Sequence, residues 1–260
     1  MLKKAINKIN GVGFVFGFLL TLTLCLGIIK SKADTLTVIK KDTNLYIQPY
    51  TNSFTTVCPD LFYRIPIIDD QTKANTIQLC NSNYAVLYST ITRTPLYSYE
   101  HEENNTASVK RNSEFKEDVR LSPNYRSTLR DYKYSGYDKG HLTPSGDMHS
   151  IDSQHSTFLL SNIAPQSSKL NQQAWRILEQ QVEQYPYKVT GVLFNAQKST
   201  ILNKRVIVPS QFYKIVSNGT CTNAYIADNT DSATVKQIDV VELNKLINND
   251  FQFPYIKCEK

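Results

Sequence analysis

The sequence predicts a mixed α+β domain whose central sheet is largely antiparallel. Strand-like segments, rich in β-branched and aromatic residues, come first and lead into an irregular stretch. A strongly helical segment follows, and further strand-like segments come after it. This order favours an α+β architecture over the regular alternation of strands and helices that builds a parallel sheet.

Residues 1–33 are predicted to form a secretory signal peptide that is cut after Ala33. Three lysines and no acid precede an apolar run at 11–29, and small residues suit the cleavage site. An uncleaved membrane anchor is the alternative, because the apolar run is long for a signal peptide. We expect a secreted or periplasmic protein without stable membrane association after cleavage, with residues 34–260 as a single domain.

The basic balance of the chain belongs mostly to this leader. The formal net charge is +6, and residues 1–33 hold five lysines and no acid, so the remainder carries a charge of +1. Charge alone therefore does not indicate nucleic-acid binding.

Four cysteines remain after the leader: Cys58, Cys80, Cys221 and Cys258. An even number in an exported chain predicts two disulfides, and pairing of sequence neighbours is the simplest of the three connectivities. Four free thiols are the alternative. The sequence has no C-x-x-C pair, which argues against a zinc site.

The elements follow in order along the chain. Residues 84–97 predict one or two strands broken near Pro95, and the polar segment 99–118 predicts a surface loop. Further strands are expected within 136–144, 157–165, 187–196 and 205–216. Residues 167–186 contain good helix formers and no glycine, and Pro186 ends the predicted helix.

The stretch "YDKGHL" places a cation and an imidazole on one face of a predicted strand. Side chains alternate along a strand, so Lys139 and His141 point the same way, and Gly140 between them leaves room for a ligand or another backbone. Lys139 could hold phosphate oxygens while His141 takes a proton from water. A surface lysine beside a structural histidine is the alternative.

The predicted helix carries an asparagine at the end of its apolar stripe. Asn171, Trp175, Leu178 and Val182 fall at i, i+4, i+7 and i+11, which is one face of a helix. The Asn171 carbonyl oxygen could bind Mg²⁺, or its amide could simply tie down a loop. Glu179 lies about 80° around the helix and could reach the same site, directly or through water. A solvated glutamate is the alternative.

Together these segments resemble the DNA/RNA non-specific endonuclease family, the ββα-metal or His-Me finger nucleases. The residues that carry the resemblance are Asp138–His141 for the family's Asp-Arg-Gly-His, "SNIAPQ" at 161–166, "LNQQAW" at 170–175, and Glu179. Weaker similarity extends roughly from residue 80 to residue 230. The ordered set of motifs is specific, whereas the four-residue motif alone is not. The resemblance implies an antiparallel central sheet flanked by helices.

The resemblance also implies a role for each matched residue. His141 is similar to the general base, Asn171 to the direct protein ligand of a single Mg²⁺, and Glu179 to a carboxylate that orients metal-bound water. Asn162 is similar to an asparagine near the metal. The arginine that stabilises charge on the phosphate is expected at Arg111, with Arg120 as the alternative. Mn²⁺ is expected to substitute for Mg²⁺.

Lys139 departs from the family, which has arginine at this position. Lysine keeps the charge and loses the planar two-pronged contact with phosphate. We therefore expect phosphate binding to survive in altered form. Asp138 points to the opposite face of the strand and is expected to support the turn.

Three functions remain as hypotheses. The first is a Mg²⁺-dependent endonuclease that cleaves DNA and RNA with little sequence specificity, with a homodimer or an inhibitor protein left open. The second is a nucleic-acid-binding protein on the same fold with impaired catalysis. The third is a zinc phosphoesterase that uses the acids and histidines of one short segment, namely His141, Asp147, His149, Asp152 and His155.

Overall fold

The computed structural model describes residues 54–101, 109–110, 114–247 and 251–258. The expected signal peptide at 1–33 and the candidate Arg111 lie outside these residues. No helix in the described part of the chain is long and apolar enough to cross a membrane.

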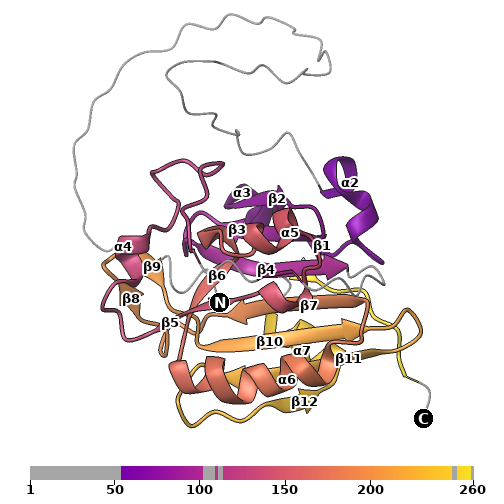
Figure 1. Cartoon of the computed structure of the whole chain (residues 1–260). Helices are drawn as coiled ribbons and strands as arrows, with labels where there is room; N and C mark the ends of the chain where they lie inside the picture. The colour runs from indigo at the N-terminus through magenta and orange to yellow at the C-terminus, as the bar shows by residue number, and fades with distance from the viewer. Residues whose placement is uncertain (1–53, 102–108, 111–113, 248–250, 259–260) are drawn as a thin grey trace, which may run out of the picture.

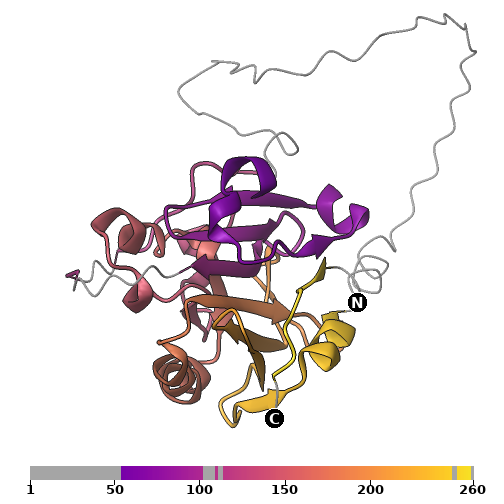
Figure 2. The same cartoon turned by 90° about the vertical axis from the view of Figure 1, so that its right-hand side faces the viewer.

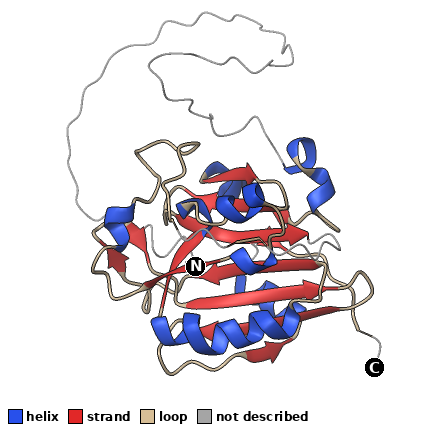
Figure 3. Cartoon of the chain, viewed as in Figure 1, coloured by secondary structure: helices blue, strands red, loops and turns tan. Residues whose placement is uncertain are grey.

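A seven-stranded sheet forms the centre of the described structure (Figures 1 and 3). Every neighbouring pair in it is antiparallel, as expected from the sequence. In spatial order the strands are β12 (Lys236–Ile238), β11 (Thr222–Asp228), β10 (Gln211–Ser217), β7 (Tyr187–Leu193), β4 (Thr94–His101), β3 (Tyr84–Ser89) and β2 (Thr76–Cys80).

Two longer helices cover opposite faces of this sheet, as Figure 2 shows. On one face, α7 (Val240–Ile247) packs its buried Leu243 against a core that includes Val189 and Ile215. On the other face, α6 (Arg176–Val182) packs Leu178 against a core that includes Val192 and Phe212 of the same strands. Because neighbouring side chains of a strand point to opposite faces, β7 and β10 are buried on both sides.

Shorter elements surround the sheet. The helical ones are α2 (Phe54–Val57), η1 (Pro59–Leu61), α3 (Asp70–Ala74), α4 (Leu129–Tyr132), η2 (Ser145–Asp147), α5 (Ile151–Ser156), η3 (Leu160–Asn162) and η4 (Leu170–Trp175). Three two-stranded antiparallel pairs complete the fold: β1 (Ile67–Ile68) with β13 (Phe251–Gln252), β5 (Asp138–His141) with β6 (Ile163–Gln166), and β8 (Ile201–Leu202) with β9 (Val206–Ile207).

Both disulfides join sequence neighbours, as expected. Cys58 pairs with Cys80, and Cys221 pairs with Cys258. The first bond ties the beginning of the described chain to β2, and the second ties its C-terminal end to the start of β11.

The expectation about Pro95 is wrong in detail. Pro95 lies inside β4, and the break between β3 and β4 falls at residues 90–93, where Arg93 has a φ of 56°. The sheet accepts Pro95 because β4 pairs with β7 only from Tyr97 onward and its pairing with β3 shifts register there. Pro165 likewise lies within the short β6, opposite Lys139.

The predicted helix is interrupted by a wider turn. Residues 170–175 form a π-helix, and the regular α-helix begins only at Arg176. Trp175, Leu178 and Val182 are buried as the apolar face predicts, whereas Asn171 is only partly buried. A π turn holds more residues than an α turn, so it shifts Asn171 away from the apolar face.

Candidate active site

A hairpin and a helix form the frame of the site. Strand β5 pairs with β6 in the register Asp138↔Gln166 to His141↔Ile163, and the chain then continues into η4 and α6. The pairing requires a glycine at position 140, because a Cβ there would lie 2.6 Å from the Cβ of Gln166. Gly140 therefore lets the Gln166 side chain cross the strand.

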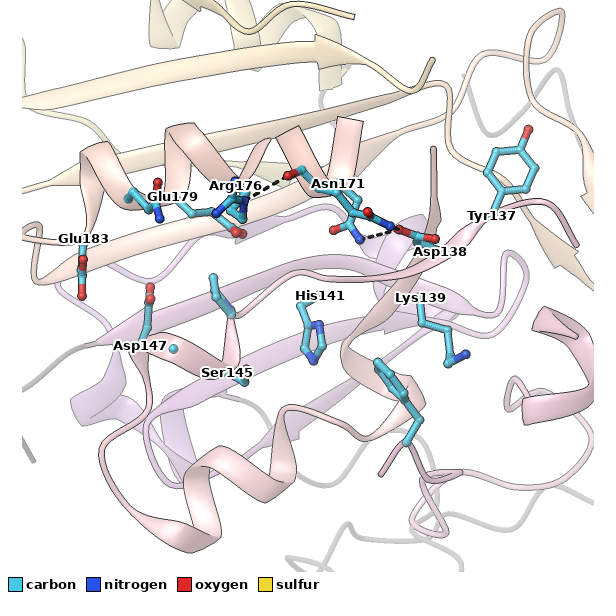
Figure 4. Close-up of a pocket in the computed structure, with 15 residues that line it drawn as sticks. Tyr137, Asp138, Lys139, His141, Ser145, Asp147, Asn171, Arg176, Glu179 and Glu183 are labelled. Atoms are coloured by element: carbon cyan, nitrogen blue, oxygen red, sulfur yellow. Dashed lines mark hydrogen bonds between the residues drawn. The ribbon is translucent and has the colours of Figure 1, made fainter. Parts of the chain in front are cut away.

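A cleft of about 930 Å³ lies between β5 and α6 (Figure 4). Strand β5 contributes Asp138, Lys139 and His141 to its lining. The helical segment contributes Asn171 and Glu179 from the other side. The sequence predictions for these residues thus converge on one cavity.

Aromatic rings hold His141 in place. The Phe158 ring meets the imidazole edge-on with centroids 4.8 Å apart, and the Phe115 ring lies 5.4 Å away. The ammonium group of Lys139 lies 4.9 Å from the centre of the same Phe115 ring. Lys139 and His141 therefore share one side of β5, as strand alternation predicts.

Asp138 does more than support the turn, because it also binds the side chain of Asn171. Its carboxylate accepts hydrogen bonds from the side chains of Asn171 at 2.9 Å, Gln172 at 2.8 Å and Ser168 at 2.7 Å. Burial alone would raise the pKa of Asp138, but these three donors outweigh it and lower the pKa. Asp138 therefore stays ionised and fixes the amide group of Asn171.

Glu179 lies in a cavity wall with several charges around it. Burial raises the pKa of Glu179 to about 7; nearby Asp147 adds to this rise, and the buried cations Lys214 and Lys188 oppose it. Asp147 forms an ion pair with Lys188 at 3.0 Å. Glu179 is thus a carboxyl group whose protonation changes near neutral pH.

Two residues that the sequence predicts for the site, Asn162 and Arg120, lie outside the cleft and hold neighbouring segments together. Asn162 is fully buried, and its side chain accepts from Thr143 N at 3.0 Å and donates to the carbonyls of Thr143 and Thr157. Arg120 pairs with Asp118 at 2.7 Å and also bonds to residues 80 and 81. Neither residue lines the cleft, so we leave both out of the proposed site.

Sequence reasoning missed several residues that line the cleft, among them Arg176 and Phe115. Arg176 lines it and could have been found, because it lies three residues before Glu179 on the predicted helix. Phe115 also lines it. Phe115 lies in the polar segment 99–118, where no pattern marked it.

The donor set fits a hard cation. The Asn171 carbonyl and the Glu179 carboxylate supply the oxygen atoms that Mg²⁺ prefers, and the Asn171 amide nitrogen is already bound to Asp138. Among the described residues, no group of three or more His, Cys, Asp or Glu side chains is placed to hold a metal ion. The arrangement therefore gives no support to the zinc phosphoesterase, whose His149, Asp152 and His155 do not line the cleft.

A β-hairpin that carries a histidine, packed on a helix that carries a side-chain oxygen able to bind a cation, is the arrangement typical of ββα-metal nucleases. Comparison with known proteins agrees, since a sequence model of the DNA/RNA non-specific endonuclease family matches residues 65–256. The chain belongs to this family.

Several relatives and one solved structure are similar to the chain. Nuclease C1 of Cunninghamella echinulata var. echinulata is 36% identical over 40% of this chain and 48% of its own length. Human mitochondrial endonuclease G is 35% identical over 41% of this chain and 42% of its own. The mitochondrial nuclease of Saccharomyces cerevisiae is 30% identical over 66% of this chain and 60% of its own. A crystal structure of the EndoG/EndoGI complex matches with a TM-score of 0.59 and 26% identity, over 68% of this chain and 84% of that chain.

The matches leave part of each curated relative uncovered. The chain spans between 42% and 60% of the length of these three relatives.

Proposed function

We propose that the protein is a Mg²⁺-dependent endonuclease that hydrolyses phosphodiester bonds of DNA and RNA with little sequence specificity. One observation carries the proposal: His141 and Lys139 from β5 line the same cleft as Asn171 and Glu179 from the helical segment. A base, a cation, an oxygen ligand for a metal ion and a carboxylate that can orient water together suit the attack of water on a phosphodiester.

Each side chain has a distinct task in this proposal. The His141 imidazole, held by Phe158, accepts a proton from the attacking water. Lys139 and Arg176 bind the non-bridging oxygens of the phosphate, so negative charge that develops there is stabilised. Asn171 would hold the metal through its carbonyl oxygen, and the Glu179 carboxylate would orient water beside it.

Mg²⁺, when bound, neutralises the phosphate and stabilises the leaving oxygen. Phosphate is common to every nucleotide and to both kinds of nucleic acid. A site built around phosphate contacts therefore reads little base sequence.

Export is part of the same proposal. The N-terminal basic and apolar segments support a signal peptide, and the two disulfides suit an oxidising compartment. We propose residues 34–260 as one secreted or periplasmic domain. The EndoG/EndoGI complex among similar structures makes an inhibitor protein the partner to look for first.

A cleavage assay tests the proposed function. Supercoiled plasmid and RNA are incubated with the purified protein in Mg²⁺, Zn²⁺ or EDTA, beside His141→Ala. We expect Mg²⁺-dependent cleavage of both substrates that the variant loses by a factor of about 10²–10⁴. A folded wild-type protein that binds DNA without cutting it would instead favour the binding-only alternative.

Lys139→Arg is the matched control for that assay. It restores the family's residue at the same position, so we expect activity to be kept or increased. A large loss would show that the site depends on the point charge of lysine.

A further inference from the structure

The two ends of the cleft differ in charge. Figure 4 shows Glu183 and Asp147 at one end, and Lys139 and Asp138 beside Tyr137 at the other. The helix α6 adds Glu179 to the acidic end. At the second end Lys139 balances the charge of Asp138, so a phosphate backbone is repelled more strongly by the first end. A bound strand should therefore extend beyond the cleft on the side of Lys139.

A basic surface continues from that side. Asn203 in the β8–β9 turn donates to the backbone carbonyls of Arg130 and Asp131 at 3.0 Å and 3.1 Å, so this hairpin lies against α4 (Figure 1). The exposed cations Arg130, Lys133 and Lys204 gather here.

Little negative charge offsets these cations. Segment 195–208 contains three cations and no acid. The only acid of segment 129–137 is Asp131, which is buried and paired with Arg205 at 3.1 Å. The concentration of charge is local, since the chain after the predicted leader is close to neutral.

An aromatic ring stands within this surface. Tyr134 is 93% exposed, the highest value among the exposed large hydrophobic residues of the described chain. The Lys133 ammonium group lies 5.0 Å from the centre of its ring. Tyr134 is three residues from Tyr137 of the cleft lining, so their Cα atoms are at most about 11 Å apart.

The backbone holds this ring outward at an energetic cost. Tyr134 has a φ of 57°, an unusual conformation for a bulky residue, and Gly136 has a φ of 78°. Hydrogen bonds between Ser135 and Tyr137 fix the turn. Such strain persists where the surrounding structure enforces it, and it often marks a binding site. Because the backbone of this turn is already fixed, base stacking on the ring does not have to order the main chain as well.

We propose that Tyr134 is a stacking platform for an unpaired base, and that Arg130, Lys133 and Lys204 contact the phosphates of the same single strand. This proposal rests on the proposed function, because it takes nucleic acid as the substrate of the cleft. Stacking on tyrosine requires a base whose face is exposed. The platform therefore gives the enzyme a preference for single-stranded nucleic acid, whatever the base sequence.

Binding measurements on a non-cleaving background test the platform. In EDTA and with His141→Ala, fluorescence anisotropy compares three labelled probes: a thymidine oligonucleotide of about 20 residues, an abasic strand of equal charge, and a duplex of equal length. Tyr134→Asn removes the ring and tolerates the positive φ. We expect it to weaken thymidine-strand binding about 5- to 10-fold and to leave the abasic strand and duplex unchanged.

Matched variants make the result specific. Tyr134→Phe keeps the ring and should bind all probes as the parent does. Tyr255→Asn removes an exposed tyrosine that lies beside Val189 and Ile215, on the sheet face opposite α6, and should change nothing. Lys204→Gln should weaken all three probes alike and lower the salt dependence of binding.

The outcomes separate the two proposals. An equal loss for thymidine and abasic strands, or no loss with Tyr134→Asn, overturns the platform even if the wild-type protein cleaves plasmid and RNA. Absence of Mg²⁺-dependent cleavage by the wild type, with a base-dependent effect of Tyr134→Asn, overturns the proposed nuclease activity and leaves the platform supported.

Discussion

The Asp138 carboxylate accepts a hydrogen bond of 2.9 Å from the side-chain amide of Asn171. The bond connects the first residue of β5 with the π-helical turn that follows β6. It occupies the amide nitrogen, so the carbonyl oxygen is the group of Asn171 that can coordinate a cation. Strand and helix thus prepare the proposed metal ligand together.

Asp138→Ala should raise the Mg²⁺ requirement without unfolding the protein. The variant releases the Asn171 amide, and loss of a partner that orients a metal ligand typically costs about 10- to 100-fold in affinity or activity. A Mg²⁺ titration of plasmid cleavage measures the shift. Asp152→Ala, which removes an exposed acid from α5, is the control. An unchanged titration for Asp138→Ala would show that the hydrogen bond does not prepare the ligand.

Substitution of Asn162 should reduce stability, whereas substitution of Asn171 should reduce activity. Asn162→Ala leaves buried backbone groups of Thr143 and Thr157 without partners, so it should lower the free energy of unfolding by about 2–4 kcal/mol. Asn171→Ala should abolish Mg²⁺-dependent cleavage with little change in stability. Urea unfolding and the cleavage assay, run on both variants, separate the roles. Similar stability losses in the two variants would contradict this division.

A pair of glycines tests the close approach between β5 and β6. Gly140→Ala should lower the free energy of unfolding by about 1–3 kcal/mol, because its new methyl group collides with the Gln166 side chain. Gly146→Ala, in the neighbouring η2, has no atom within 4 Å of the new Cβ and should be nearly neutral. Urea unfolding curves compare the two. Equal effects would mean that the collision relaxes freely.

Glu179 should make stability depend on pH in the absence of metal. Its pKa is raised from 4.5 to about 7 in the folded protein, so between these values the native state keeps a proton that the unfolded chain has lost. The free energy of unfolding therefore falls as pH rises through this window, by on the order of 1–3 kcal/mol. Urea unfolding in EDTA at about pH 5 and about pH 7.5 measures the difference, which Glu179→Gln should reduce. An equally steep decline in the variant would assign the pH dependence to other groups.

Local patterns predicted the strands and the motif residues well. The alternation of "DKGH" placed Lys139 and His141 on one side of β5, and both contact Phe115 there. The apolar spacing on the helix also predicted the burial of Trp175 and Leu178. These features depend on neighbours within a few residues, which the sequence displays directly.

Contacts between distant segments were less accessible. Alternation puts Asp138 on the face away from His141, and only the packed structure shows that this face meets Asn171, 33 residues later. Asn162 has the family's residue type, but its burial and its three bonds depend on where the loop after β5 lies. The π turn has no periodic signature, since the flanking helix formers suit a regular helix equally well.

The π turn at 170–175 has a consequence for how this family can vary. It holds one residue more than an α-helical turn, and each residue of a regular helix turns the chain by about 100°. Deleting a single residue between Asn171 and Arg176 would let the segment close into an ordinary helix and swing Asn171 by that angle relative to Glu179. Substitution of side chains in the turn leaves the angle between Asn171 and Glu179 around the helix unchanged, whereas an insertion or deletion changes that angle. Side chains in this turn can therefore be substituted during evolution. An alignment of active relatives should contain no insertion or deletion within it.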